Sequence, residues 1–238
     1  MTEIPSIKKE LKDRLVEYCE KYDVPIEYLI DIISDQKVLP MIRGKGVEYN
    51  LFNLLTSLLN TKEWRVEKRD INPQPNKIDE DIVVVHIKSG TEIIVECKSA
   101  VRGSFRLKTR NHDKPHFHIK CHKSRSFIGK KTNDRYFASD FDIVISNPSN
   151  AFILSGKKFE INKEPKVMEY LENYYRVKNS EEIFKASCKD WRFAITKEIA
   201  NSEGVIDRTP LVLFENDEKW RNLDKIEEAL VKVLELKL

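Results

Sequence analysis

Apolar residues near the start of the chain recur every three or four positions, which is the spacing of an amphipathic helix. The pattern predicts a helix over residues 7–22, with Ser6 as its N-cap, and a shorter helix over residues 26–33 after Pro25. Gly44 and Gly46 then predict a flexible loop. A further helix is expected over residues 47–59. Its apolar stripe consists of Leu51, Leu54, Leu55, Leu58 and Leu59.

The middle of the chain changes to strand patterns. Two runs rich in β-branched residues, at 82–87 and 92–98, are separated by Ser89 and Gly90, which predicts a β-hairpin with a tight turn. Residues 102–131 show no periodicity, and we expect long loops there. Strands are expected again at 141–146 and 151–154, on either side of Asn147 and Pro148.

The last third of the chain alternates between the two patterns. It predicts helices at 165–176 and 180–188, strands near 191–195 and 211–214, and a leucine-rich helix from residue 223 onward. Helices and strands that alternate in this way indicate a mixed α/β chain.

Composition narrows the class of protein. Of 238 residues, 40% are hydrophobic and 34% are charged, which is enough apolar material for a folded core. The net charge is only +3, so affinity for an anionic polymer would depend on how the charges are distributed. The four cysteines form no CxxC pair and follow no secretory signal, which favours the cytoplasm. No apolar run approaches the roughly 18 residues of a membrane span, so we expect no membrane insertion.

The predicted hairpin carries a cluster of charged side chains. Because side chains alternate along a strand, Glu96 and Lys98 share one face, while Val95 and Cys97 share the other. Pairing across the turn brings Asp81 beside Glu96, and two carboxylates form the kind of oxygen site that magnesium prefers. Cys97 is expected to be a small core residue.

Glu48 adds a third acid. It precedes Leu51, Leu55 and Leu59 by three, seven and eleven residues and therefore lies on the apolar stripe of the helix. An ionised carboxylate in such a place needs a compensating partner, such as Lys98 or a metal-bound water.

These residues together resemble a known group. The run Gly46-Val47-Glu48, then Asp81, then Val95-Glu96-Cys97-Lys98 is similar to the PD-(D/E)XK nuclease superfamily over about residues 44–100 and the strand expected at 142–146. The resemblance implies a restriction-endonuclease-like α/β fold, a central mixed β-sheet flanked by helices with family-specific additions. It also implies that Asp81 and Glu96 bind Mg²⁺, that Lys98 assists the attacking water, and that Glu48 joins them.

Two alternatives remain open at this site. The proline that names the motif is absent here, and Asp79 shares a face with Asp81, so Asp79 is a second candidate metal ligand. Most Glu and Lys residues in strands are solvated. The alternative interpretation of these residues is therefore purely structural, a surface hairpin with a cross-strand salt bridge.

A basic block follows the hairpin. Residues 102–131 contain ten Lys or Arg residues and one acid, Asp113, interleaved with Phe105, Phe117 and Phe127, which is typical of a surface that meets a phosphate backbone. Arg110 and Asn111 have the donors to read base edges in the major groove. The candidate DNA-binding residues are Arg102, Arg106, Lys108, Arg110, Asn111, His112, Lys114, Lys120, Lys123 and Arg125.

The same block suggests a competing zinc site. Its softer ligands would come from His112, His116, His118, Cys121 and His122, but their spacing matches no closed zinc pattern.

We expect one endonuclease domain over residues 1–238, with a catalytic core at about 44–155, an N-terminal helical part at 1–43 and a C-terminal α/β part at 156–238. The resemblance and the length favour a type II restriction endonuclease that hydrolyses double-stranded DNA at a specific sequence and leaves 5′-phosphate ends. The alternatives are a structure-specific repair or recombination nuclease, and a DNA-binding protein without catalysis. Symmetric cutting favours a homodimer. The leucine-rich end helix either packs on its own core or pairs two subunits.

Overall fold

The computed structural model describes residues 4–69, 81–123, 127–128, 131–132, 134–154 and 160–238. The chain falls into two compact units, Met1–Gly46 and Val47–Leu238. Each unit is built from elements whose bounds follow largely from the sequence pattern. The division of the second unit into a catalytic core and a C-terminal part stays a prediction.

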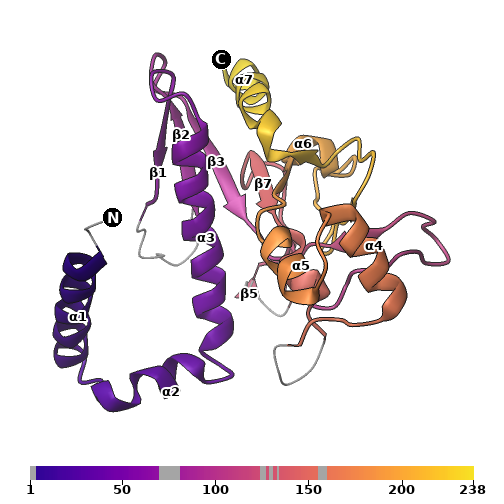
Figure 1. The fold of residues 1–238 in the computed structure, drawn as a ribbon. Coiled ribbons are helices and arrows are strands. Elements are labelled where there is room, and N and C mark those ends of the chain that lie inside the picture. The colour runs from indigo at the N-terminus through magenta and orange to yellow at the C-terminus, as the bar shows by residue number, and fades with distance from the viewer. Residues whose placement is uncertain (1–3, 70–80, 124–126, 129–130, 133, 155–159) are drawn as a thin grey trace. The chain divides into compact units, whose positions relative to one another are not determined.

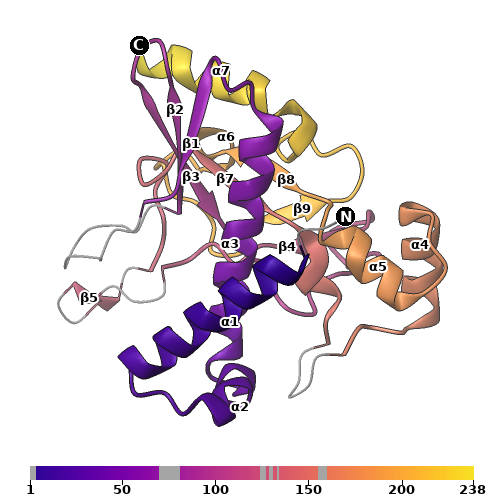
Figure 2. The same ribbon diagram turned by 60° about the vertical axis from the view of Figure 1, so that its left-hand side comes forward.

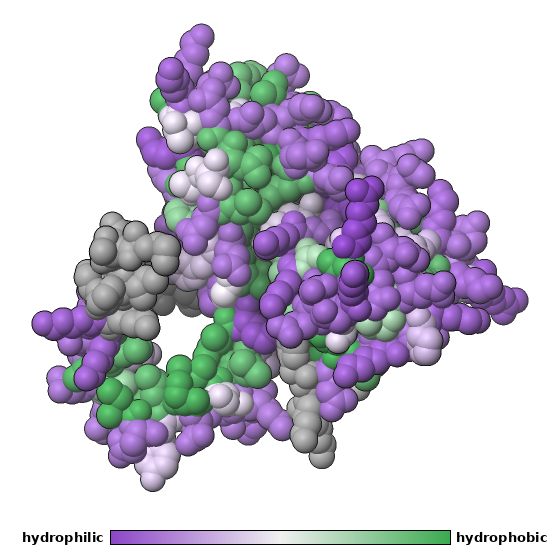
Figure 3. Space-filling view, in the orientation of Figure 1, coloured by the Kyte–Doolittle hydropathy of each residue, from purple (hydrophilic) through white to green (hydrophobic). Residues whose placement is uncertain are grey.

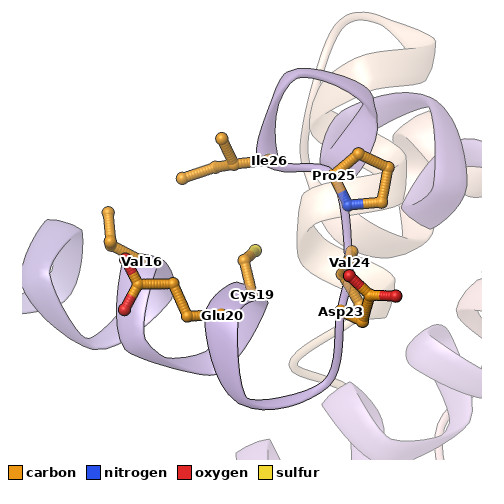
Figure 4. Close-up of a pocket in the computed structure, with 7 residues that line it drawn as sticks. All are labelled: Val16, Cys19, Glu20, Asp23, Val24, Pro25 and Ile26. Carbon is orange, nitrogen blue, oxygen red and sulfur yellow. The ribbon is translucent and has the colours of Figure 1, made fainter.

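The N-terminal unit is helical. It contains α1 (Ile4–Lys21), the 3₁₀ turn η1 (Ile26–Tyr28) and α2 (Leu29–Ser34), which confirms both expected helices. Ser6 as an N-cap is wrong, because α1 begins two residues earlier at Ile4. A shallow pocket lies where α1 meets the segment leading to η1, lined among others by Cys19 and Ile26 (Figure 4). Apolar side chains are exposed along this unit near α2, where Figure 3 shows hydrophobic atoms on the surface.

Helix α3 (Leu39–Leu58) runs through the glycine-containing segment. The expected loop at Gly44 and Gly46 is therefore wrong. Neither glycine has a positive φ, and a β-carbon built on either would meet no atom within 4 Å, so nothing in the structure requires glycine there. Glycine lowers helix propensity but does not end a helix by itself. Leu51, Leu55 and Leu59 of the predicted stripe are buried, whereas Leu58 is exposed.

The second unit is organised around a sheet that contains six strands among the described residues: β1 (Trp64–Glu67), β2 (Ile82–His86), β3 (Glu92–Cys97), β7 (Ile143–Ser146), β8 (Arg192–Ile195) and β10 (Arg221–Asn222), in that spatial order. Figure 1 labels the first four of these strands. The β3–β7 pair is parallel and the other pairs are antiparallel. The fold is α/β with a mixed sheet flanked by helices, as expected.

The β2–β3 hairpin confirms the sequence pattern. Ile82 pairs with Val95 and Val85 with Glu92. The turn is closed by a 2.8 Å hydrogen bond that Gly90 N donates to the carbonyl of His86, and Gly90 has φ +71°, a conformation that glycine adopts without strain. Strand β1, which pairs with β2, was not among the expected strands.

Two apolar layers cover the faces of the sheet. On one face, α3 and α7 (Ile226–Lys237) pack against side chains such as Ile93 and Val95. On the other face, α4 (Pro165–Tyr175), α5 (Ser180–Ser187) and the small β4–β9 sheet (His116–His118 and Leu211–Leu213) form a second core with Val144; Figure 2 shows α4 and α5 side by side. The sheet therefore lies between two layers, and β3 is inside it.

One further expected strand can be checked. The strand at 151–154 is wrong, because Pro148 and Asn147 start a 3₁₀ helix, η2 (Pro148–Phe152), and Ile153 forms only an isolated bridge. The short elements β5 (Phe127–Ile128), β6 (Lys131–Thr132), α6 (Thr196–Ile199) and η3 (Leu223–Lys225) complete the described chain.

The end helix packs on its own core. Its predicted apolar face, Leu223, Ile226, Leu230, Val233 and Leu234, is buried against the sheet. These side chains are therefore not exposed for pairing with a second subunit. Within the described ranges, no helix combines the length and apolar character that crossing a bilayer requires.

Candidate functional site

The charged face of β3 forms the centre of the candidate site. Lys98 Nζ forms an ion pair with Glu96 Oε1 and donates a 3.0 Å hydrogen bond to the hydroxyl of Tyr136. Tyr136 Oη also lies 3.5 Å from Glu96 Oε1. Glu96 is 4% exposed, so this is a buried group of three polar side chains. The backbone of Lys98 is fixed by a 2.9 Å bond from its N–H to the carbonyl of Ile145 on β7.

Asp81 is held beside this group. It directly precedes β2, and the register that pairs Ile82 with Val95 places Asp81 opposite Glu96 when it is continued by one residue. Its Oδ2 accepts a 2.9 Å hydrogen bond from the backbone N–H of Cys97. The expected juxtaposition of the two carboxylates is therefore present.

Glu48 reaches the same site from α3, but through an unexpected partner. Lys68, just after β1, donates to Glu48 Oε2 at 3.1 Å and to the backbone carbonyl of Asp81 at 3.2 Å. The side chains of Glu48 and Lys68 are each only 13% exposed. The compensating ammonium that the sequence requires for Glu48 is thus Lys68, where Lys98 or a water was expected.

The electrostatics of Glu96 reflect this crowding. Burial raises the pKa of the Glu96 carboxyl to about 7; the neighbouring Lys98 opposes the shift, while the charges of Asp81 and Glu48 add to it. Burial works against the charged form of Lys98, but Glu96 and Tyr136 outweigh it and raise the pKa of Lys98, which is an ammonium at neutral pH. The charges of Lys98, Asp81 and Glu48 therefore all influence the protonation of Glu96.

Cys97 behaves as the strand alternation predicts. Its side chain joins the apolar layer formed with α3 and α7, on the face of β3 opposite to Lys98. Burial raises the pKa of the Cys97 thiol well above its ordinary value, and the charge of Asp81 adds to the shift. A neutral thiol is a poor nucleophile, so Cys97 is a core residue.

The donor set can be compared with the needs of a cation. No group of three or more His, Cys, Asp or Glu side chains converges on a possible metal position in the part of the chain that the structure describes. Magnesium, however, is commonly held by one or two carboxylates together with waters and substrate phosphates. Asp81 and Glu96 fit that smaller requirement. Glu96 Oε2 is buried and has no hydrogen-bond partner among the described residues, which leaves one carboxylate oxygen available to a ligand.

Asp79, the second candidate metal ligand, and Arg125 lie outside the described residues. The other basic candidates divide into two groups. Arg102 and Arg106 donate to backbone carbonyls, Arg102 to that of Leu154 at 2.8 Å and Arg106 to that of Phe105 at 2.7 Å. The second group is exposed, as is Arg106 in the first, and it comprises Lys108, Arg110, Asn111, His112, Lys114 and Lys120.

Lys123 is the basic candidate with the most direct link to the site. Its Nζ lies 2.9 Å from Asp140 Oδ2 and 5.3 Å from the ring centroid of Tyr136, the residue that binds Lys98. The basic block therefore approaches Tyr136 through this residue.

Two of the interleaved aromatic residues have a different role from the one expected. Phe105 and Phe117 are buried in the second core, where each ring packs against Phe214. Their alternation with charged residues reflects inward and outward positions, so they do not face a nucleic acid.

The zinc alternative gains little from the structure. Cys121 is buried, and burial raises the pKa of its thiol to about 12, which disfavours the thiolate that zinc binds. The rings of His112, His116 and His118 are neighbours, with centroids 5.3 and 5.8 Å apart in sequence order. As stated above, the described residues contain no converging set of three ligands.

Sequence reasoning missed Lys68 and Tyr136. Lys68 follows β1, a four-residue strand too short to stand out, and Tyr136 lies in a segment without periodicity. The one available signal was indirect, since the buried acid Glu48 requires a cation from another segment.

The chain was also compared with known proteins. Neither a family model, nor a curated protein, nor a solved structure matches it.

Proposed function

We propose that this chain is a magnesium-dependent endonuclease that hydrolyses phosphodiester bonds of double-stranded DNA. The observation that carries the proposal is the arrangement of Asp81, Glu96 and Lys98, which brings two carboxylates and an ammonium together in a buried site with one carboxylate oxygen lacking a partner among the described residues. The resemblance of these residues to the PD-(D/E)XK superfamily supports the same conclusion.

Asp81 and Glu96 would hold Mg²⁺, which would neutralise phosphate charge and lower the pKa of a water for attack. Lys98 would orient that water or stabilise the phosphate, because its ammonium remains charged at neutral pH. Glu48 and Lys68 would fix the outer side of the site through their ion pair and the bond from Lys68 to the backbone of Asp81.

The exposed basic residues after β3 support DNA as the substrate. Arg110, Lys114 and Lys120 are exposed on the segment that follows the catalytic strand, and Lys123 links that segment to Tyr136. Such a group neutralises backbone phosphates irrespective of sequence. Type II restriction, with sequence-specific cutting, 5′-phosphate ends, a homodimer and a cytoplasmic location, is the specific form of the proposal.

Digestion of a plasmid with and without Mg²⁺ tests the function. Discrete fragments that require Mg²⁺ are the expected result; nicks at branched or bent DNA would instead indicate a structure-specific nuclease, and intact but bound DNA would contradict catalysis. Lys98→Ala should lower the cleavage rate about 10²- to 10³-fold, as removal of a preorganised charge does. Tyr175→Phe is the control, because Tyr175 bonds to Asp190 and does not touch the site.

Sedimentation of the protein with and without DNA tests the homodimer. A pair of subunits on one DNA duplex is expected, whereas a monomer under cutting conditions would contradict it. Because the apolar face of α7 is buried in its own core, a contact between subunits would have to use another surface.

A further inference from the structure

Tyr136 lies outside the hairpin that carries the charged residues. It precedes β7 and is separated from Lys98 by 38 positions in the chain. The side chain is 6% exposed, and its ring packs edge-on against Phe141 with centroids 5.1 Å apart. Its backbone carbonyl accepts a 2.9 Å hydrogen bond from Ile206 N. Tyr136 is thus fixed by its own surroundings and does not depend on Lys98 for its position.

Two parts of Tyr136 contact the same ammonium. The hydroxyl accepts the 3.0 Å hydrogen bond from Lys98 Nζ, and the ring centroid lies 4.8 Å from that nitrogen. The second distance is within the range of a cation–π interaction. Lysine has a long side chain with many rotamers, so an ammonium held at two points by a rigid ring is far more restricted than one held by a single carboxylate.

Glu96 alone is a poor anchor for Lys98 during the proposed reaction. Glu96 would share its negative charge with a bound cation, and that sharing weakens its attraction for the Lys98 ammonium. Tyr136 binds Lys98 through its hydroxyl oxygen and its ring, and these contacts do not compete with a cation on Glu96 in this way. The neighbouring Lys123 is paired with Asp140, so Tyr136 Oη serves Lys98.

We propose that Tyr136 is a positioning residue that holds the Lys98 ammonium in the site when Glu96 engages a divalent cation. The inference rests on the proposed nuclease function for its consequence in catalysis. Whether Tyr136 fixes the position of the Lys98 ammonium can be measured in the protein without DNA.

The experiment compares wild type with Tyr136→Phe, which keeps the ring and removes the hydroxyl, and Tyr136→Leu, which removes both. Tyr175→Phe is the matched control, because Tyr175 donates its hydroxyl to Asp190 at 2.9 Å in a partly buried position away from Lys98. Lysine signals are recorded by NMR with and without Mg²⁺, and Lys98→Arg identifies the Lys98 signals. Urea denaturation confirms that each variant is folded.

In wild type, the terminal methylene of Lys98 should show an upfield ring-current shift, and its ammonium protons should exchange slowly, with Mg²⁺ present. Tyr136→Phe should keep the shift but exchange faster, and Tyr136→Leu should lose both features. Cleavage by Tyr136→Phe should be slower about 10- to 100-fold at saturating DNA, as for loss of a residue that orients a catalytic group, with DNA affinity unchanged. Tyr175→Phe should match wild type in every measurement.

Lys98 signals that are unchanged in Tyr136→Phe and Tyr136→Leu would overturn the inference, as would wild-type cleavage by Tyr136→Phe. If wild type cuts no DNA with Mg²⁺, the nuclease proposal fails, and the NMR comparison still decides whether Tyr136 holds Lys98. The two failures are therefore distinguishable.

Discussion

The backbone N–H of Cys97 donates a 2.9 Å hydrogen bond to Oδ2 of Asp81. This bond ties the carboxylate of Asp81, which directly precedes β2, to the end of β3. Asp81 is 9% exposed, so the N–H of Cys97 has little access to water as an alternative acceptor. The Asp81 side chain therefore has a structural role and, in the proposed function, also binds the metal ion.

These two roles of Asp81 can be separated by substitution. Asp81→Asn keeps an oxygen that can accept from Cys97, whereas Asp81→Ala leaves that N–H buried without an acceptor. We expect Asp81→Ala to lower the free energy of unfolding by about 1–3 kcal/mol more than Asp81→Asn does. Both should lose magnesium-dependent cleavage. Urea denaturation and plasmid cleavage measure the two effects. Equal stabilities of the two variants would contradict the structural role of Asp81 as the acceptor for the Cys97 N–H.

Lys68→Ala should destabilise the protein. It leaves Glu48, a largely buried carboxylate, without its 3.1 Å partner, and it removes the bond to the carbonyl of Asp81. We expect a loss of about 1.5–3 kcal/mol in the free energy of unfolding. Lys185→Ala is the matched control, because its pair with Glu181 is exposed at 69% and 77%, and such pairs contribute at most about 1 kcal/mol. Equal losses would show that the Glu48–Lys68 pair contributes no more than a surface pair.

The raised pKa of Glu96 predicts how stability changes with pH. Its folded-state value of about 7 exceeds the ordinary 4.5, so the folded state favours the protonated carboxyl. The stabilisation is complete below pH 4.5 and is lost as pH rises through about 7. Denaturation of the magnesium-free protein between pH 5.5 and 8 should show this decline. In Glu96→Gln the contribution should be absent.

Glu92→Gln is the control for that titration. Glu92 lies on the same strand, and its hydrogen bond with Arg69 holds the pKa of its carboxyl below the usual value, so it is ionised throughout this window. The pH dependence of Glu92→Gln should therefore match that of wild type. A Glu96→Gln variant with the wild-type decline would contradict the raised pKa of the buried Glu96 carboxyl.

The glycines of α3 offer a test that does not involve the site. Gly44 and Gly46 are helical, have no positive φ and have space for a methyl group. Gly44→Ala and Gly46→Ala should each raise the free energy of unfolding by about 0.5–1 kcal/mol. Gly90→Ala should lower it, because Gly90 has φ +71°. Thermal denaturation of the three variants measures the effect, and a loss of stability in the α3 variants would contradict a continuous helix.

The hairpin and its charged face are predictable because strand alternation is a local feature, whereas the connection between the strands is longer than the predicted tight turn. The observed register pairs Ile82 with Val95, and continued by one residue it places Asp81 opposite Glu96; a two-residue turn at Ser89 and Gly90 would have placed Asp81 opposite Lys98. Glu48 could be assigned to the site because an acid on an apolar helix stripe is unusual. The same local reasoning failed at Gly44 and Gly46. The low helix propensity of glycine predicted a loop there, but α3 continues through both residues.

The partners of these residues could not be predicted in the same way. Lys68 and Tyr136 reach Glu48 and Lys98 only through the tertiary fold, from segments 20 and 38 positions away. Phe105 and Phe117 were assigned to a DNA-facing surface because their alternation with basic residues does not reveal which side faces inward. The β4–β9 pairing, which buries Phe117 opposite Val212, determines that side.

Calorimetric titration of the metal-free protein with Mn²⁺, as a stand-in for Mg²⁺, tests the central claim most directly, because it measures cation binding by Asp81 and Glu96 without requiring DNA. Wild type should bind the ion, and Asp81→Asn and Glu96→Gln should each abolish or greatly weaken that binding, while Glu92→Gln binds as wild type does. Binding of equal strength in all four proteins, or no binding in the wild type, would contradict a cation site built from these carboxylates.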